Sequence, residues 1–471
     1  MLRIGTLLMI VVFMSLNTLF VHALGSQSRK PNIIFIMADD LGYGDLGSYG
    51  QKIIKTPRLD QMAAEGMKFL QCYAGSTVCA PSRSVLMTGQ HTGHTYIRGN
   101  AKVNLRPEDV TVAEVLKKGG YATALIGKWG IGHEGSNGMP TRQGFDHFFG
   151  YLDQHHAHNF YPTFLIRGES RVKLDNVVPN EGKYGQGMAS VKKEYTHDLL
   201  VEDTLDWVDK NHDKPFFLYL ALTIPHANNE AGRKGMEIPS YGIYKDKDWP
   251  EPQKGHAAMI TQMDTDIGKL FDRLKKHGID EDTIVFFTSD NGPHAEGGNN
   301  PNFANSNGNL RGIKRALYDG GIRVPMIVRW PGKIRAGAVS DHPWAFWDVL
   351  PTAAELGGVS KHVPKNIDGL SIVPALFEKP CKQHEFFFWA FFEQGSRRAI
   401  LMGDYKLIEQ GGRGGPLELY NIAKDIGETK NIVKQHPELV KKMYPIMDRE
   451  ISPNPHWSFK DYKKPKPRKK K

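Results

Sequence analysis

Cysteine is scarce in this chain, and long apolar runs are nearly absent. Three cysteines occur among 471 residues, Cys72, Cys79 and Cys381, too few for a disulfide-stapled scaffold. Beyond residue 23 no stretch approaches the roughly 18 apolar residues of a membrane-spanning helix, so we expect no integral membrane association. The chain also lacks internal repeats, and it has no nucleic-acid-binding motif or basic run interleaved with aromatic residues. We therefore expect no nucleic-acid partner.

The two ends of the chain differ in composition from the rest. Arg3 precedes an apolar run from Leu7 to Leu16, and Val21-His22-Ala23 fits a cleavage site. This pattern predicts a signal peptide at 1–23 and a secreted or periplasmic protein, with an uncleaved anchor as the alternative. Residues 460–471 carry +7 of the net charge of +10. We expect this basic tail to be disordered and solvated, or to tether the protein weakly to a polyanion.

Strand-like and helix-like segments alternate along most of the chain. Residues 32–38 and 283–289 are apolar runs typical of strands buried on both faces, and 259–277 is an amphipathic helix pattern. This alternation predicts an α/β fold with a large, mixed but mostly parallel sheet flanked by helices. We place this catalytic domain at 24–380. The segment 145–194 reads as loops.

A smaller C-terminal domain is predicted at 381–459. Residues 385–392 and 397–407 have the pattern of strands in a small antiparallel sheet, and 437–451 has that of a closing helix.

Several of the predicted strands end in polar side chains. If these strands are parallel neighbours, the side chains meet at one edge of the sheet, where open α/β sheets bind ligands. They are Asp39, Asp40, Lys128, His226, Asp290 and Asn291. Four oxygen donors suit a hard cation, Ca²⁺ or Mg²⁺, and a cation together with basic groups suits a tetrahedral anionic ester.

One stretch, Cys79-Ala80-Pro81-Ser82-Arg83-Ser84-Val85-Leu86-Met87-Thr88-Gly89, stands apart from the rest. It places a cysteine in a tight turn, with a helix expected to begin at Ser84. A helix N-terminus with a guanidinium beside it can hold a tetrahedral anion, although a lone cysteine is more commonly a buried small hydrophobe. The stretch resembles the sulfatase signature Cys-x-Pro-Ser-Arg-x-x-x-Leu/Met-Thr-Gly at every position. In that family the cysteine is oxidised to formylglycine, whose hydrated form is the nucleophile.

The resemblance to type I sulfatases, within the alkaline phosphatase-like superfamily, extends over nearly the whole mature chain. Further motifs fall in family order at 39–40, 56–60, 127–129, 225–226, 290–292 and 314–325. The resemblance implies that Ca²⁺ is held by modified Cys79 with Asp39, Asp40, Asp290 and Asn291. It also implies that Arg83 stabilises the hydrated aldehyde and that Lys128 and Lys314 hold the sulfate. His226 would protonate the leaving oxygen or bind the sulfate.

The family mechanism implies a two-step reaction and a maturation partner. One hydroxyl of the hydrated aldehyde attacks sulfur, and deprotonation of the other then expels sulfate, a release that serine could not perform. A formylglycine-generating enzyme must modify Cys79. Many sulfatases have a histidine directly after the Gly-Lys-Trp motif, whereas this chain has Gly130. The base for sulfate release is therefore open between His133 and the 155–158 cluster.

The substrate is indicated only by composition and family resemblance. We expect His133, His156 and His158 to contact substrate, whereas Trp389 fits domain packing better than sugar binding. Loops rich in aromatic residues favour a carbohydrate sulfate as the substrate, such as sulfated galactose or N-acetylgalactosamine in a polysaccharide. An aryl sulfate is the other sulfate ester considered. The alternatives are a phosphonate or phosphate ester hydrolase of the same superfamily, and a non-catalytic binder of sulfated glycans if Cys79 stays a thiol.

Overall fold

A computed structural model describes residues 30–464 of the chain. The predicted signal peptide and most of the basic tail lie outside this range. Within it, no helix has the length and apolar character needed to cross a membrane. None of the three cysteines forms a disulfide.

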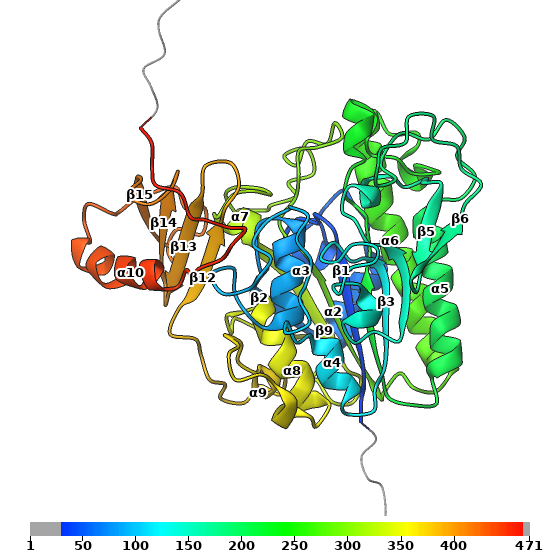
Figure 1. Cartoon of the computed structure of the whole chain (residues 1–471), viewed down its shortest axis with the longest axis horizontal. Coiled ribbons are helices and arrows are strands. Elements are labelled where there is room, and N and C mark those ends of the chain that lie inside the picture. Colours follow the sequence, from blue (N-terminus) through cyan, green and yellow to red (C-terminus); the bar gives the residue numbers. More distant parts are fainter. Residues whose placement is uncertain (1–29, 465–471) are drawn as a thin grey trace, which may run out of the picture.

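The centre of the molecule is a mixed sheet of eleven strands (Figure 1). Strand β1 lies in the middle and pairs in parallel with β7 on one side and β8 on the other, while β9 runs antiparallel to β8 and β2. The strands are β1 (Asn32–Ala38), β2 (Met67–Tyr73), β3 (Ala122–Lys128), β4 (His147–Tyr151), β5 (Phe164–Arg167), β6 (Ser170–Lys173), β7 (Phe216–Ala221), β8 (Thr283–Ser289), β9 (Arg323–Arg329), β10 (Ala338–Ser340) and β11 (Trp344–Ala345).

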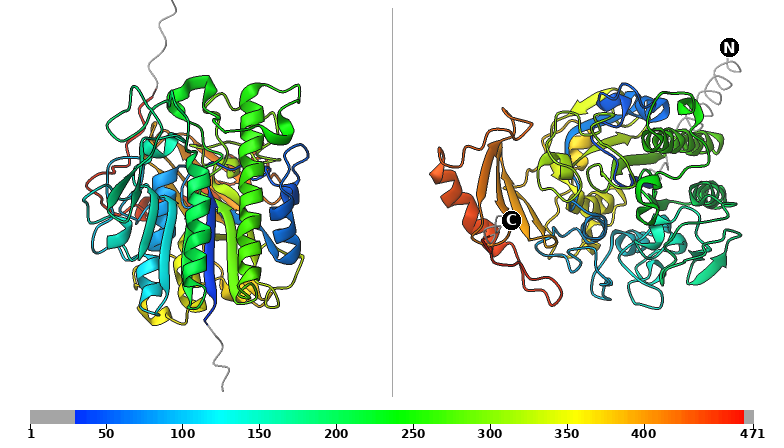
Figure 2. Two further views of the ribbon diagram at one scale, coloured as in Figure 1. Left: turned by 90° about the vertical axis from the view of Figure 1, so that its right-hand side faces the viewer. Right: turned by 90° about the horizontal axis from the view of Figure 1, so that it is seen from above.

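Helices cover both faces of this sheet (Figure 2). Alternate side chains of β1 point to opposite faces, as the period of a strand requires. Ile33, Phe35 and Met37 pack with α3, α4 and α8, whereas Ile34 and Ile36 pack with α2, α5 and α6. The helices are α2 (Pro57–Glu65), α3 (Cys79–Thr88), α4 (Val112–Lys117), α5 (Thr196–Asn211), α6 (Glu251–Lys276), α7 (Asp319–Ile322), α8 (Val349–Leu356), α9 (Val373–Leu376) and α10 (Pro437–Arg449).

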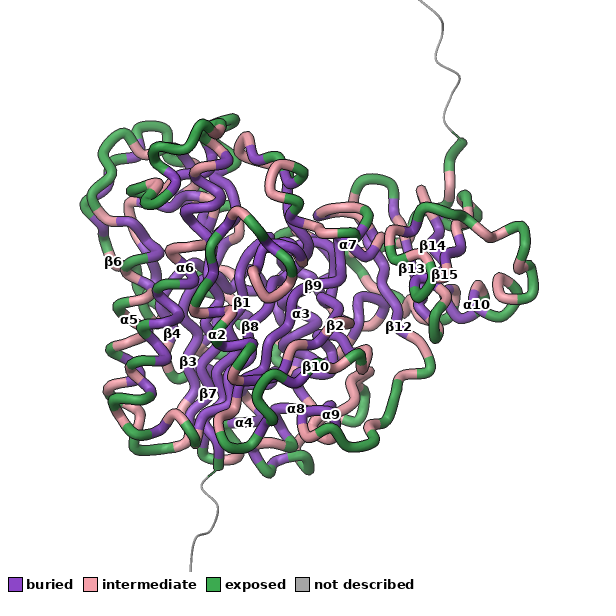
Figure 3. The backbone as a smooth tube through the Cα atoms, turned by 180° about the vertical axis from the view of Figure 1, so that it is seen from behind, coloured by how far each residue is buried: buried purple, intermediate pink, exposed green. Residues whose placement is uncertain are grey.

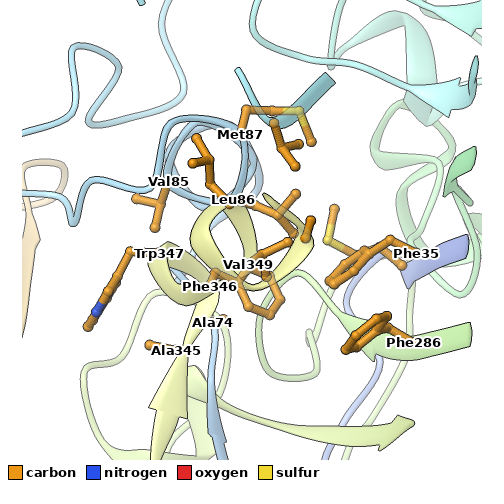
Figure 4. Packing of buried hydrophobic residues seen from close by; sticks show 14 of the residues in the cluster. Phe35, Ala74, Val85, Leu86, Met87, Phe286, Ala345, Phe346, Trp347 and Val349 are labelled. Carbon is orange, nitrogen blue, oxygen red and sulfur yellow. The ribbon is translucent and has the colours of Figure 1, made fainter. Parts of the chain in front are cut away.

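The core beneath α3 is built from aromatic and aliphatic side chains. Figure 4 shows Leu86 of α3 and Val349 of α8 gathered with Phe346, next to Phe35 and Phe286 from neighbouring strands. The Phe35 and Phe286 rings stack with their centroids 5.9 Å apart. In Figure 3 the central strands are buried along their length while the outer loops are exposed. This packing fixes α3 against the sheet.

A separate antiparallel sheet of four strands lies in the C-terminal region, with α10 against it (Figures 1 and 2). Its strands are β12 (Phe387–Phe391), β13 (Arg397–Met402), β14 (Tyr405–Gln410) and β15 (Leu417–Asn421). Trp389 of β12 is fully buried, and its Nε1 donates to the Ala74 carbonyl of the large sheet's region at 2.9 Å. This side chain therefore joins the two parts of the molecule rather than facing solvent.

The fold class is as predicted, and several element boundaries are not. Helix α6 begins at Glu251 instead of residue 259, because Pro252 sits in the first turn, where a helix tolerates proline. The predicted strand at 397–407 is a hairpin, since Gly403 at φ 56° turns the chain between β13 and β14. The predicted loop segment 145–194 contains β4, β5 and β6.

Two histidines bridge the large domain and the end of α10. The rings of His91 and His94 stack with centroids 4.2 Å apart. His94 Nδ1 lies 2.9 Å from Asp368 Oδ1, and its Nε2 lies 3.7 Å from Glu450. Burial opposes the charge on His94, but the hydrogen bond to Asp368 outweighs it, so the pKa of His94 is raised.

We expect the ion pair between His94 and Asp368 to stabilise the folded protein at acid pH. Because the folded-state pKa of His94 is raised, its contribution is complete below the unfolded value of about 6.5 and is lost as pH rises through the folded value. At pH 5.5 a His94→Gln variant should lose about 1 kcal/mol of unfolding free energy and melt below wild type. At pH 8.5 its melting temperature should be close to that of wild type. A difference in melting temperature between variant and wild type that is equal at both pH values would contradict this prediction.

Candidate active site

The polar residues predicted at strand ends meet at one edge of the sheet. Asp39 and Asp40 directly follow β1, Asp290 and Asn291 directly follow β8, and Lys128 is the last residue of β3. Strands β1, β3, β7 and β8 are parallel, so their carboxyl ends share that edge. All five side chains are buried.

The backbone at Asp40 brings the two neighbouring carboxylates into the site together. Asp40 has φ 65°, a left-handed conformation that costs about 1 kcal/mol or more outside glycine, although aspartate tolerates it better than most residues. The Asp40 N–H donates to Asp290 Oδ1 at 3.1 Å, and Asn291 Nδ2 donates to Asp40 Oδ1 at 2.7 Å. These bonds hold the ends of β1 and β8 together.

Cys79 is the first residue of α3, so the helix begins five residues earlier than the sequence predicted. Pro81 falls within the first turn, where its missing N–H is not needed. The Ala80 N–H is satisfied by the side-chain oxygen of Asn100 at 3.0 Å. Cys79 Sγ lies 3.4 Å from Asp39 Oδ1. The cysteine therefore sits at a helix N-terminus against the carboxylates.

Arg83 lies one turn further along α3 and is fully buried. It donates to Asp290 Oδ2 at 2.9 Å and to the Lys128 carbonyl at 2.6 Å, and it lies 3.5 Å from Asp39 Oδ2. The pKa of Arg83 is raised, because nearby negative groups outweigh burial. A permanently charged guanidinium thus links three elements beneath the cysteine.

Two lysines complete the cluster. Lys128 Nζ lies 2.6 Å from Asp39 Oδ2, and Lys314 Nζ lies 2.8 Å from Asp40 Oδ2. Lys314 also donates to His226 Nε2 at 3.0 Å and to Glu296 at 3.1 Å. Each carboxylate of the 39–40 pair therefore has its own buried ammonium partner.

His226 carries its proton on the nitrogen that faces away from the cluster. Its Nδ1 lies 2.7 Å from the Ala227 carbonyl, which can only accept, so Nδ1 donates and Nε2 presents a lone pair to Lys314. Burial, reinforced by the charge of Lys314, holds the pKa of His226 well below its usual range. The imidazole is therefore neutral.

The carboxylates of the cluster have different proton affinities. Burial raises the pKa of Asp290 to about 7, and the charge of Asp39 adds to the effect. Burial acts on Asp39 as well, but the positive charges of Lys128 and Arg83 outweigh it, so the pKa of Asp39 is well below its ordinary value.

The donor set fits a hard divalent cation. Asn291 Oδ1 is buried and has no hydrogen-bond partner among the described residues, which is unusual for a buried amide oxygen. Ligand atoms of Asp39, Asp40, Cys79 and His226 lie within 4.8 Å of one another. Carboxylate oxygens together with the unpaired amide oxygen of Asn291 are ligands of the kind that Ca²⁺ and Mg²⁺ bind.

Known proteins are similar in sequence to this chain over most of its length. A model of the sulfatase family matches residues 31–359. The chain belongs to the sulfatase family. A model of the C-terminal region of N-sulphoglucosamine sulphohydrolase matches residues 313–451 of this sulfatase. Family and relatives together make it a sulfuric ester hydrolase.

Two relatives and one solved structure illustrate the similarity. N-acetylgalactosamine-6-sulfatase of Canis lupus familiaris is 30% identical over 400 residues, covering 80% of this chain and 71% of the relative. Arylsulfatase A of Homo sapiens is 31% identical over 456 residues, covering 86% and 84%. The crystal structure of Ps i-CgsB in complex with k-i-k-neocarrahexaose is 28% identical with a TM-score of 0.76, covering 92% of this chain and 95% of that one.

The three histidines predicted to contact substrate lie in two places in this sulfatase, because His133 and His156 line one cavity whereas His158 lies against His226. His158 stacks on His226, with ring centroids 4.9 Å apart and planes at 13°. His133 instead contacts Asp153 at 3.1 Å and Asn104 at 2.6 Å. His156 is buried against Phe164. Of the predicted bases, the 155–158 cluster therefore places a ring beside His226, and His133 does not.

Glu296 is a member of the sulfatase cluster that the sequence reading missed. It lies 3.1 Å from Lys314 Nζ, 3.9 Å from His226 Nε2 and 2.6 Å from Arg315. Burial opposes its charge, but Lys314 outweighs this and lowers the pKa of Glu296 to about 2. The signal was available, because Glu296 lies shortly after Asp290 and Asn291 at the end of β8.

Proposed function

We propose that this sulfatase hydrolyses sulfate esters of carbohydrates with a formylglycine made from Cys79 and a bound Ca²⁺. The observation that carries the proposal is the position of Cys79 Sγ, 3.4 Å from Asp39 in a buried cluster that also holds Arg83, Lys128 and Lys314. The neighbouring Asn291 Oδ1, which lacks a partner in the described chain, supports the cation. Mg²⁺ is the second candidate for the same oxygen donors.

The charges of the cluster favour an anionic ester. The cluster holds four carboxylates and four cations, so their formal charges cancel: Asp39, Asp40, Asp290 and Glu296 face Arg83, Lys128, Lys314 and Arg315. A divalent cation among them leaves an excess of positive charge in a buried site, where electrostatic interactions are strong. Such a site binds a sulfate ester and stabilises the charge that grows as sulfate departs.

The position of each residue in the cluster indicates its role in the proposed reaction. Lys128 and Lys314 offer ammonium protons to the sulfate oxygens, each held in place by a carboxylate. Arg83 fixes the orientation of residue 79 from the same helix. The aldehyde supplies a hydrated nucleophile that can release sulfate, and the cation supplies charge stabilisation. His226, whose neutral Nε2 accepts a hydrogen bond from Lys314 Nζ, is the residue proposed to protonate the leaving oxygen or to bind the sulfate beside it.

A sulfated sugar is the substrate that the comparisons favour. One relative is an N-acetylgalactosamine-6-sulfatase, and a solved relative is in complex with a neocarrahexaose. We propose sulfated galactose or N-acetylgalactosamine units of a polysaccharide. This assignment requires a formylglycine-generating enzyme as a maturation partner. The secreted or periplasmic location predicted from residues 1–23 and the domain bounds of 24–380 and 381–459 remain part of this proposal.

Two measurements test the proposal. Mass spectrometry of the peptide that contains Cys79 should show the aldehyde in place of the thiol. The modified enzyme should release sulfate from sulfated galactose or N-acetylgalactosamine oligosaccharides, and should cleave an aryl sulfate faster than the matching aryl phosphate. A faster phosphate reaction would reject the substrate class. A Cys79 thiol in protein that binds sulfated glycans without hydrolysing them would establish the non-catalytic alternative.

Removing the cation should lower both stability and activity. Chelation leaves three carboxylates and an amide oxygen without the cation that they coordinate. We therefore expect a lower melting temperature and loss of sulfate release, both restored by Ca²⁺. At a free Ca²⁺ concentration of 100 times Kd the gain is about 2.7 kcal/mol. An Asn291→Ala variant should show a smaller calcium-dependent shift in melting temperature. An unchanged melting temperature and rate after chelation would contradict the cation assignment.

A further inference from the structure

A cavity of about 410 Å³ is lined in part by the segments that follow β3 and β4. Its volume is within the range of sites that take a sugar-sized ligand. Basic side chains line much of it, among them Lys102, Arg171 and Lys183, together with His133 and Tyr184. None of the roles proposed above uses the three basic residues.

Two of the three cations in this cavity have no acidic partner within the described part of the chain. Arg171 is paired with Glu134 at 2.8 Å, and Asp153 is occupied by His133 at 3.1 Å. Neither Lys102 nor Lys183 has a carboxylate within 4.0 Å in residues 30–464. Their ammonium groups instead lie over the ring of Tyr184, at 2.8 Å and 5.8 Å from its centroid. The cavity therefore presents two ammonium groups without an ion-pair partner in residues 30–464 around one aromatic face, and its three cations outnumber Glu134 and Asp153 by one.

A continuous series of rings joins this cavity to the reaction centre. His158 stacks on His226 at 4.9 Å, His155 lies 5.6 Å from His158, and Tyr184 lies 6.4 Å from His155. The second connection runs along the chain, because Asn100, which caps the Ala80 N–H, is two residues before Lys102. A saccharide with its sulfate at residue 79 would lie along these rings toward the two lysines.

We propose that this cavity is a subsite for a second anionic group, a sulfate or a carboxylate, on the sugar next to the one that loses its sulfate. The inference rests on the proposed function and narrows its substrate to polyanionic oligosaccharides. Aromatic rings and ammonium groups suit a sugar face and an attached anion, respectively. Because both lysines are exposed, each charge contributes modestly, and together we expect about a tenfold preference for the doubly anionic substrate.

The test compares three disaccharides that carry the same sulfate on the terminal sugar. The neighbouring sugar carries a carboxylate, a second sulfate or a neutral carboxyl methyl ester. In wild type, kcat/KM for the better anionic form should exceed that for the methyl ester about tenfold, and the gap should narrow at high salt. A Lys102→Ala/Lys183→Ala variant should lose this preference. Whichever anion gives the larger preference identifies the group that the cavity takes.

Lys118→Ala is the matched control, because Lys118 is an exposed lysine at the end of α4, near the amino ends of the strands. It should keep the wild-type preference. A preference that persists in the double variant, or that is absent in wild type, would overturn the subsite.

Calorimetric binding of the same disaccharides to a Cys79→Ala protein, with and without the lysine substitutions, separates the two proposals. A binding preference that needs the lysines, without turnover of any disaccharide by wild type, rejects only the proposed function. Turnover without any preference rejects only the subsite.

Discussion

A Cys79→Ser variant is expected to accept sulfate once and then stop. The serine hydroxyl occupies nearly the place of the thiol, at the N-terminus of α3 and beside Asp39. It can attack sulfur and displace the alcohol, but the resulting serine sulfate has no second hydroxyl whose deprotonation could expel the sulfate. We therefore expect steady-state sulfate release to vanish, with one equivalent of alcohol released and a sulfated peptide visible by mass spectrometry.

The controls for this variant separate chemistry from folding. Cys79→Ala should release no alcohol at all, because it has no nucleophile, and should retain a melting temperature near that of Cys79→Ser. Cys79 is buried beside charged groups, so a loss of activity with a large fall in melting temperature would report folding instead. Continued turnover by Cys79→Ser would contradict the need for an aldehyde.

The strand ends were the part of the site that the sequence predicted best. Apolar runs of strand length define β1 and β8 without ambiguity, and parallel pairing then requires that Asp39, Asp40, Asp290 and Asn291 converge. Lys128 follows by the same rule at the end of β3. The local sequence pattern indicated the strands, whereas their parallel pairing was a condition of the prediction that the structure supplies.

Other features depended on tertiary contacts that have no local signature. Helix α3 begins at Cys79 because Asn100 caps its first turn from a distant loop. Strand β4 contains Gly150 and is defined by parallel pairing with β3, so its own residues read as loop. Lys314 reaches the cluster from a loop after β8, and only the family resemblance pointed to it.

The site also depends on a buried charge network that no sequence pattern indicated. Lys406 of β14 lies 2.7 Å from Asp319 and 2.9 Å from Glu428, and all three side chains are fully buried. Asp319 begins α7, where the Gly321 carbonyl accepts the Gly292 N–H at 3.1 Å, directly after Asn291. The C-terminal sheet thus holds the segment that supports the proposed cation ligands.

A Lys406→Met variant is therefore expected to lose about 3–5 kcal/mol of unfolding free energy, because buried Glu428 loses its cation and buried Asp319 loses one of its two. Unfolding monitored by calorimetry measures the loss. Lys424→Met, at an exposed turn next to β15, is the matched control and should stay near wild type. Adding Glu428→Gln to Lys406→Met should recover part of the stability, since Asp319 keeps Arg323 at 3.2 Å. Equal melting temperatures for the two lysine variants would reject the network.

The deficit of Lys406→Met should also grow with pH. Burial already raises the pKa of Glu428 to about 7 with the lysine present, and removal of the ammonium raises it further. A carboxyl group with a raised folded-state pKa stabilises the fold fully below its unfolded pKa of about 4.3, and that contribution is lost as pH rises through the folded value. The melting temperature of Lys406→Met should therefore fall further below wild type at pH 8 than at pH 5. The added Glu428→Gln substitution should remove most of this dependence, which assigns it to that carboxyl group.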